Sequence, residues 1–313
     1  MKTPCRLRPA CAAFWRWTLS ALTLGAAGAL APAQELEPRA YSNAPVGLNF
    51  LIGGYAFSDG KVGVDPSIPL EDAEVEVHST FLAYVRTLNL WGRSAKVNVA
   101  LPFSWADGSA KLDGVPHERD VSGLGDPRLR FSTLFFGGPA LSMEEFIKHE
   151  SDFIVGGSLE VTAPLGQYDS DKLLNIGSNR WSFKPELGIS KALGPFTLEF
   201  ISGIRFYTDN DDFLDGRTLE VDPIYSFQGH VIYSFPSGIW VGFDALYYIG
   251  GQPTVDGNSA DSLANARVGL TLSLPINVYN SVKLYGSTDV YSKTDTEFVV
   301  AGIAWQFRWG AGL

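Results

Sequence analysis

The sequence predicts an all-β protein: a transmembrane antiparallel up-and-down β-barrel of about twelve strands, with long outer loops and short periplasmic turns. Three observations predict this fold class. Apolar and polar residues alternate with a period of two along most of the chain, which is typical of strands. The alternating segments exceed the usual strand length of about 5–6 residues and reach the roughly 9–11 that a tilted membrane strand needs. Long polar connections alternate with short ones.

The composition excludes several classes of protein. The chain has 313 residues, of which 45% are hydrophobic, and its formal net charge is −10. This apolar content argues against a disordered chain, and the acidic balance argues against nucleic acid as a partner. The mean hydropathy of +0.04 is too low for a bundle of transmembrane helices.

The first 33 residues have the layout of a secretory signal peptide. A basic start that contains Lys2 and Arg6 precedes an apolar stretch that ends in Ala31-Pro32-Ala33. This stretch is shorter than the roughly 20 residues of a membrane anchor. We therefore expect residues 1–33 to be cleaved and residues 34–313 to form the barrel. Both cysteines, Cys5 and Cys11, would be lost, which would exclude disulfides and thiol chemistry from the mature chain.

Twelve strands are expected in the rest of the chain. They lie near residues 46–58, 73–88, 94–107, 125–136, 152–164, 180–192, 195–208, 223–236, 238–250, 262–275, 280–292 and 297–309. The last of them shows the clearest alternation, with aromatic and aliphatic residues on one parity and polar or small residues on the other.

Along the chain, long polar connections between these strands alternate with short ones. Long ones are expected near residues 59–72, 108–124, 165–179, 209–222 and 251–261. One connection on the short-turn side, residues 137–151, breaks the rule. Its sequence from Ser142 to Glu145 fits a capping box, so we expect a short helix there.

Period-two alternation alone also fits a soluble β-sandwich, and three features favour the membrane. Aromatic residues lie near strand ends, as expected for interfacial girdles, in the sets Phe103/Trp105, Phe196/Phe206 and Trp305/Phe307/Trp309. Charged residues lie in mid-strand on the opposite parity, which a dry core would not tolerate. The apolar parity of the last strand continues to Leu313, which suits recognition by the barrel-assembly machinery. We expect location in the outer membrane after export through the periplasm.

If the apolar parity of each strand faces lipid, a set of ionisable side chains lines the lumen. They are Glu74, Glu76, His78, Arg86, Lys96, Arg128, Arg130, Glu160, Lys184, Glu186, Glu199, Arg205, His230, Asp244, Arg267, Lys283, Asp289 and Arg308. Twelve strands enclose a lumen of intermediate width. Two interpretations stay open: a salt-bridge network that fills and stiffens the barrel, or a charge ladder along a permeation path.

No motif for catalysis or cofactor binding emerges, so we expect neither an enzyme nor a cofactor. His78 precedes Ser79, but adjacent strand residues face opposite sides. The acidic loop 209–222 fails as an EF-hand, because a register that starts at Asp211 places Phe213 at a ligand position. We expect a solvated acidic loop without a metal site. A loosely held divalent cation that bridges lipopolysaccharide phosphates is the alternative.

Five stretches resemble the outer-membrane family named for the MetA pathway of phenol degradation. They are Glu37-Pro-Arg-Ala-Tyr-Ser-Asn-Ala-Pro-Val-Gly-Leu-Asn-Phe50, Val121-Ser-Gly-Leu-Gly-Asp-Pro-Arg128, Thr162-Ala-Pro-Leu-Gly-Gln-Tyr-Asp169, Asn175-Ile-Gly-Ser-Asn-Arg-Trp-Ser-Phe-Lys-Pro-Glu186 and Ala301-Gly-Ile-Ala-Trp-Gln-Phe-Arg308. The resemblance implies a Gram-negative barrel, surrounded by outer-membrane lipid and lipopolysaccharide, for passive uptake of small hydrophobic or aromatic compounds. The alternative is a structural or surface-interaction barrel with a plugged lumen.

Pro185 lies within one of these stretches, on the parity expected to face lipid. Proline removes one hydrogen bond from the strand ladder, so we expect a bulge or a local opening. A local opening would let a hydrophobic solute leave the lumen sideways, whereas a bulge would be structural only.

Overall fold

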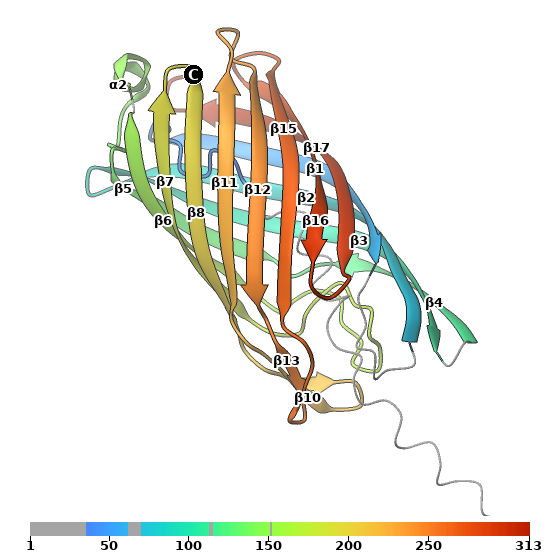
Figure 1. Ribbon diagram of the computed structural model, residues 1–313. Coiled ribbons are helices and arrows are strands. Elements are labelled where there is room, and N and C mark those ends of the chain that lie inside the picture. Colours follow the sequence, from blue (N-terminus) through green and yellow to red (C-terminus); the bar gives the residue numbers. More distant parts are fainter. Residues whose placement is uncertain (1–35, 62–69, 113–114, 151) are drawn as a thin grey trace, which may run out of the picture.

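The computed structural model describes residues 36–61, 70–112, 115–150 and 152–313. The expected signal peptide, residues 1–33, lies outside these described residues. The described chain forms a closed antiparallel barrel (Figure 1). Closure is complete because β1 pairs on one side with β2 and on the other with β17, the last strand of the chain. The predicted fold class is confirmed.

The barrel wall contains each of the twelve predicted strands, with ends that shift by a few residues. They are β1 (Leu48–Lys61), β2 (Leu70–Leu90), β3 (Arg93–Leu112), β5 (Arg128–Phe136), β6 (Phe153–Thr162), β7 (Ser182–Leu193), β8 (Phe196–Tyr207), β11 (Ile224–Ser234), β12 (Trp240–Gly250), β15 (Leu263–Pro275), β16 (Asn280–Ser292) and β17 (Glu297–Gly310). Each pairs with its neighbours along the chain, so the meander is up-and-down.

The strands differ in length around the barrel. β2 and β3 have 21 and 20 residues, whereas β6 has 10. The C-terminal half of β3 pairs with β4 (Val115–Leu124), and its N-terminal half pairs with β5. We expected the residues of β4 to lie in a loop, because Pro116 and four charged or histidine side chains obscure the alternation.

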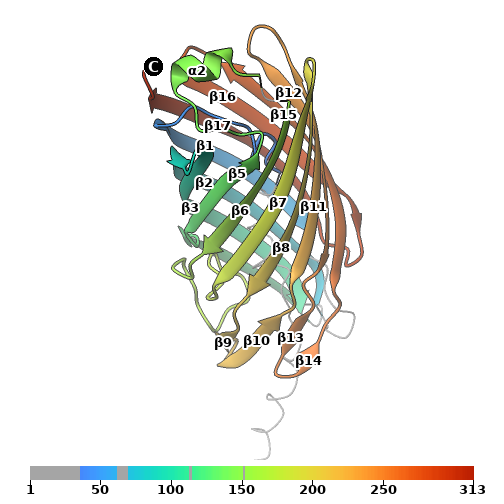
Figure 2. The same ribbon diagram turned by 90° about the vertical axis from the view of Figure 1, so that its left-hand side faces the viewer.

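Two of the expected long loops form a small sheet of their own. It contains β9 (Asn210–Phe213), β10 (Arg217–Val221), β13 (Pro253–Val255) and β14 (Asn258–Ser259), in the order β14-β13-β10-β9. This sheet lies beyond the long-loop end of the barrel (Figures 1 and 2). Strands of 2–5 residues are too short to show alternation, which is why the sequence did not predict them.

The opposite end of the barrel carries tight turns and one helix. Between β2 and β3, Trp91 and Gly92 both have positive φ (50° and 82°), as a two-residue hairpin turn with the twist of the strands requires. The predicted short helix is α2 (Met143–Lys148). Its capping box is complete: Ser142 Oγ accepts from the Glu145 amide, and the Glu145 carboxylate accepts from the Ser142 amide.

The outer surface of the barrel wall is rich in exposed apolar side chains, and the aromatic sets predicted as girdles are on it. Trp305, Phe307 and Trp309 stack in a row with ring centroids 6.2 and 5.5 Å apart. Phe196 and Phe206, at the two ends of β8, are each 44% exposed. Among the described residues, no helix is both long and apolar enough to cross a membrane.

Candidate functional site in the barrel lumen

Thirteen of the eighteen side chains predicted for the lumen point into it. They are Lys96, Arg128, Arg130, Glu160, Lys184, Glu186, Glu199, Arg205, His230, Asp244, Arg267, Lys283 and Asp289. Arg308 shares their side of β17 but lies at the short-turn rim, where its Nε donates to the Val278 carbonyl at 2.6 Å. The structure therefore brings most of the predicted set together in one enclosed space.

The lumen prediction is wrong for the four residues on β2. Glu74, Glu76, His78 and Arg86 face outward. His78 Nε2 lies 3.0 Å from Glu76, and its Nδ1 lies 2.6 Å from the hydroxyl of Tyr55 on the neighbouring strand.

Most of the residues of β2 that do face inward are apolar, contrary to the rule that placed the apolar parity in lipid. Val75 and Val77 are 3% and 2% exposed and form one cluster with Leu174 and Ile176. Those two partners belong to residues 163–181, here named the lumen loop, which folds into the barrel. Because this loop supplies apolar contacts inside, the apolar face of β2 is buried in protein rather than exposed to lipid.

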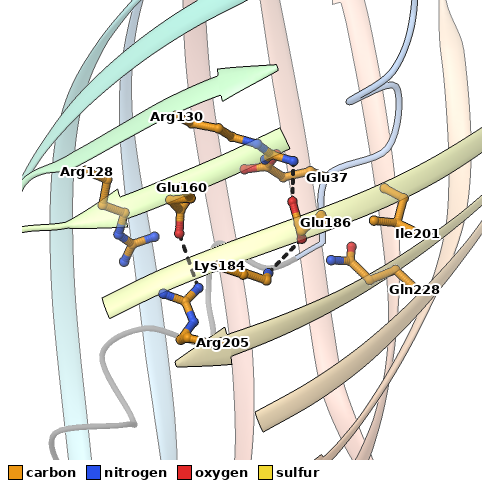
Figure 3. Close-up of a pocket in the computed structure, with 9 residues that line it drawn as sticks. All are labelled: Glu37, Arg128, Arg130, Glu160, Lys184, Glu186, Ile201, Arg205 and Gln228. Atoms are coloured by element: carbon orange, nitrogen blue, oxygen red, sulfur yellow. Dashed lines mark hydrogen bonds and ion pairs between the residues drawn. The ribbon is translucent and has the colours of Figure 1, made fainter. Parts of the chain in front are cut away.

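An ion-pair network crosses the inner faces of β5, β6, β7 and β8 (Figure 3). Arg130 is its centre and binds both Glu37 and Glu186. Lys184 Nζ lies 3.0 Å from Glu186, and Arg205 lies 3.2 Å from Glu160. Alternation places these side chains on one face, since they occupy every second position of adjacent strands.

This network surrounds a small polar cavity. Its lining residues are Glu37, Arg128, Arg130, Glu160, Lys184, Glu186, Ile201, Arg205 and Gln228 (Figure 3). Four cations face three anions, and Ile201 is the single apolar residue of the lining. Buried charges lose their hydration and are stable only with good partners. The lumen at this level is therefore packed with paired charges.

A second buried cluster lies on β11, β12 and β15. His230 Nδ1 lies 2.7 Å from Asp244, and Thr271 Oγ1 donates to the other Asp244 oxygen at 2.7 Å. Beside it, Arg267 binds Asp289 through two hydrogen bonds of 3.0 and 2.8 Å. Within the described chain, His230 Nε2 has no hydrogen-bond partner. The pair thus lacks the serine that a hydrolytic triad would place at that nitrogen.

No sequence pattern indicated a segment that enters the lumen before β1. Residues 36–47, here named the lumen segment, contact the inner faces of strands around the barrel. Glu37 is the Arg130 partner, and Lys96 Nζ donates to the carbonyls of Ala40 and Ser42 at 3.3 and 2.8 Å. Since this segment has neither alternation nor helical periodicity, its sequence pattern resembles an ordinary linker.

The lumen loop is held at its base by one carboxylate. Asp126, between β4 and β5, accepts hydrogen bonds from the Gly166 amide at 2.9 Å and from the amide and hydroxyl of Ser178 at 2.8 and 2.6 Å. Asp126 thus ties both ends of the lumen loop to the barrel wall.

Of the two alternatives expected at Pro185, a bulge or a local opening, the bulge does not form. β7 keeps one register with β8 on both sides of the proline, with Phe183 opposite Phe206 and Glu186 opposite Gly203. On its other edge Pro185 pairs with Leu159 of β6. The missing proline N–H therefore leaves only Lys184 and Pro185 without ladder partners on β8.

Of the acidic loop 209–222, β9 and β10 form a hairpin, in which Thr218 Oγ1 donates to Asp211 at 3.3 Å. No group of three or more histidine, cysteine or acidic side chains suited to a metal ion occurs among the described residues.

Fold and lumen together define a transmembrane β-barrel with a charged interior and an apolar exterior. The chain belongs to the family described as "Putative MetA-pathway of phenol degradation", whose sequence profile matches residues 56–299. The family resemblance expected from the sequence is thereby confirmed. The comparison with curated proteins gave no match.

Solved structures of similar fold include two membrane-protein types. The COG4313 outer membrane channel from Pseudomonas putida F1 is 21% identical, with a TM-score of 0.76 over 88% of this chain and 100% of that one. The β-domain of the Bordetella autotransporter BrkA is 9% identical, with a TM-score of 0.52 over 84% of this chain and 100% of that one. At these identities the likeness concerns the fold.

Proposed function

We propose that this protein is an outer-membrane channel through which small hydrophobic or aromatic compounds diffuse passively. The observation that supports this function most directly is the closed barrel itself. It is apolar outside and lined inside by charged side chains from most of its strands. Such a barrel is one of the few ways to enclose a polar path within lipid. The family description, which names phenol degradation, and the similar fold of an outer membrane channel support the solute class and the location.

The proposal includes the surroundings of the barrel. Export would follow removal of residues 1–33, and the barrel-assembly machinery would recognise β17, whose Trp305 and Trp309 are exposed on its outer face. Outer-membrane lipid and lipopolysaccharide would then contact the apolar surface. The thirteen inward ionisable residues would line the path. A lateral exit beside Pro185 would need β7 and β8 to part where their ladder is already interrupted. A channel needs no catalysis, and we propose none.

A second candidate is a structural or surface-interaction barrel that transports nothing. The observation that favours it is the packed lumen, in which Glu186 and Arg267 are 5% and 1% exposed and the lumen segment crosses the interior. In that case the buried ion pairs would only stiffen the wall. The two candidates differ in one point. A channel needs a continuous path past the lumen segment and the lumen loop, either open at rest or opened by their movement, whereas a structural barrel has no such path.

Conductance of the purified protein in planar bilayers, with phenol uptake by loaded liposomes, separates the two candidates. We expect discrete channel events and faster phenol entry than in protein-free liposomes. Heat-modifiable migration on unboiled gels verifies that the barrel is assembled. Assembled protein that gives neither channel events nor phenol entry would contradict the channel and favour the structural barrel. Lys148→Ala, on the exposed surface of α2, is a matched control that should leave both readouts unchanged.

A further inference from the structure

The lumen segment, residues 36–47, is anchored to the inside of the barrel wall by side chains from many strands. The amide of Arg39 donates to Glu199 at 2.6 Å, and its guanidinium lies 5.0 Å from the ring centroid of Trp240. Arg39 has a φ of 68°, a left-handed conformation that a non-glycine residue adopts at a cost. The segment therefore holds a strained turn against the wall inside the lumen.

Tyr41 of the lumen segment is buried against the inner wall of the barrel. It is 1% exposed and forms a cluster with Leu134, Ile154 and Ile201, which are side chains of the wall. Its hydroxyl lies 3.2 Å from Ser158 Oγ. The barrel wall thus encloses a phenol ring in apolar contacts and offers a hydroxyl partner at the ring's polar end.

Two glycines form the floor beneath this ring. Gly156 and Gly188 are directly opposite each other in the ladder between β6 and β7. A Cβ at Gly188 would lie 2.2 Å from the Tyr41 ring, and one at Gly156 would lie 2.5 Å from it, both far inside van der Waals contact. The ring consequently lies directly on the backbone of two strands. We name this place the ring slot and define it by Leu134, Gly156, Ser158, Gly188 and Ile201.

We propose that the ring slot is a binding site for phenolic solutes on the permeation path, and that Tyr41 is its tethered competitor. A phenol has the same ring and hydroxyl as the Tyr41 side chain, so it makes the same contacts with the slot. When it enters, Tyr41 leaves and the lumen segment is released from the wall. This inference rests on the proposed channel function and adds a solute class and a site to it.

The tether sets the concentration at which a solute competes. A group held on a short flexible linker has an effective concentration in the roughly millimolar range. Tyr41 is also held by its neighbours, because Glu37 binds Arg130 and Lys96 binds two segment carbonyls. Phenol should therefore displace the segment at millimolar concentrations or above, and not at micromolar ones.

Displacement can be measured without transport, through one cysteine added to the lumen segment. The natural cysteines are Cys5 and Cys11, so Ala40→Cys adds a reporter next to Tyr41, and the parent protein gives the background. In purified, reconstituted protein, phenol should raise the rate at which a membrane-impermeant maleimide labels this cysteine several-fold. Cyclohexanol carries the hydroxyl on a thicker, puckered ring that the glycine floor does not admit, and it should have no such effect.

Two substitutions separate a natural site from an artificial cavity. Tyr41→Ala vacates the slot and should bind phenol more tightly, by about tenfold if the slot is free for a tenth of the time in the parent. Gly188→Ala places a methyl group in the slot and should abolish the phenol response, although it also expels Tyr41. Gly156→Ala serves the same purpose from the other strand if the first variant does not assemble, as judged by heat-modifiable migration.

The outcomes are distinct. Phenol that saturates Tyr41→Ala but leaves labelling of Ala40→Cys unchanged would overturn the proposal, because the slot would be only an engineered cavity. A Gly188→Ala protein that responds to phenol like the parent would overturn it as well. Phenol-dependent labelling without channel events or phenol uptake would support the ring slot and contradict the channel function.

Discussion

Two segments fill the barrel from opposite ends, and different chemistry holds them. The lumen segment joins β1 at the short-turn end and is held by the ion pair of Glu37 with Arg130, by lysine hydrogen bonds and by one ring. The lumen loop enters from the end of β6 and is held by Leu174 and Ile176 in an apolar cluster. Polar contacts can be exchanged for water or a polar solute, and the Tyr41 ring can be exchanged for a phenol, whereas water and phenol do not replace the aliphatic contacts of Leu174 and Ile176. We therefore expect the lumen segment to be the movable part and the lumen loop to be the fixed one.

Breaking the ion-pair centre should have the largest effect. In Arg130→Leu, Glu186 would stay buried with only Lys184 and the Ser158 hydroxyl as partners, and Glu37 would lose its anchor. Removing one member of a buried pair costs about 3–5 kcal/mol, which a urea unfolding transition of the reconstituted barrel would measure. Lys148→Ala, which removes an exposed pair with Glu144, is the control and should cost about 0.5 kcal/mol or less. Equal losses in the two variants would contradict the role given to Arg130.

The apolar anchor of the lumen loop should come next. Leu174 is 7% exposed, so Leu174→Ala should lower the free energy of unfolding by about 2–3 kcal/mol, at the low end for a buried leucine because a loop can relax. Leu165 belongs to the same loop but is 72% exposed, and Leu165→Ala is the matched control. Channel conductance should rise in Leu174→Ala and stay unchanged in the control. A loop that loosens equally in both would show that the apolar cluster does not hold it.

Substitution of Asp126 tests the hydrogen bonds at the base of the same loop. Asp126→Asn keeps the shape of the side chain but replaces one accepting oxygen with an NH₂ group that faces donors. Losing one or two buried hydrogen bonds should cost about 1–2 kcal/mol. The loss should appear as faster proteolysis within residues 163–181, at an unchanged barrel transition. If proteolysis of the loop stays at the parent rate, Asp126 does not fasten it.

The wall of the barrel could be predicted because its signal is local. Alternation, strand length and turn spacing are properties of neighbouring residues, and in the last strand lipid and lumen impose them on successive positions. The capping box from Ser142 to Glu145 is local in the same way, and α2 formed as expected. β4 was missed for the converse reason, since Pro116 and the charges of an exposed strand remove the pattern.

The contents of the lumen could not be predicted, because they depend on contacts between residues distant in sequence. Arg130 and Glu37 are 93 positions apart, and no local sequence pattern indicates that they pair. The error on β2 has the same origin. Its apolar parity was assigned to lipid because lipid was the only apolar partner the sequence offered, while Leu174 supplied another one from within the barrel. Placing a strand face therefore requires knowing what the lumen contains.

The smallest effect lies outside the barrel wall, where the capping box of α2 makes helix stability depend on pH. The Ser142 amide donates to the Glu145 carboxylate at 2.9 Å, and this hydrogen bond lowers the pKa of Glu145 below its ordinary value. A lowered pKa in the folded state means that the stabilisation is present above the ordinary pKa and is lost as the pH falls through the lowered one. Amide hydrogen exchange of residues 143–148 should therefore accelerate, relative to its intrinsic rate, on acidification through that window, while the exchange of β7 stays slow. Glu145→Gln keeps an accepting oxygen but no titrating charge, so its helix should show no such pH dependence. A variant that follows the parent profile would assign the effect to another group.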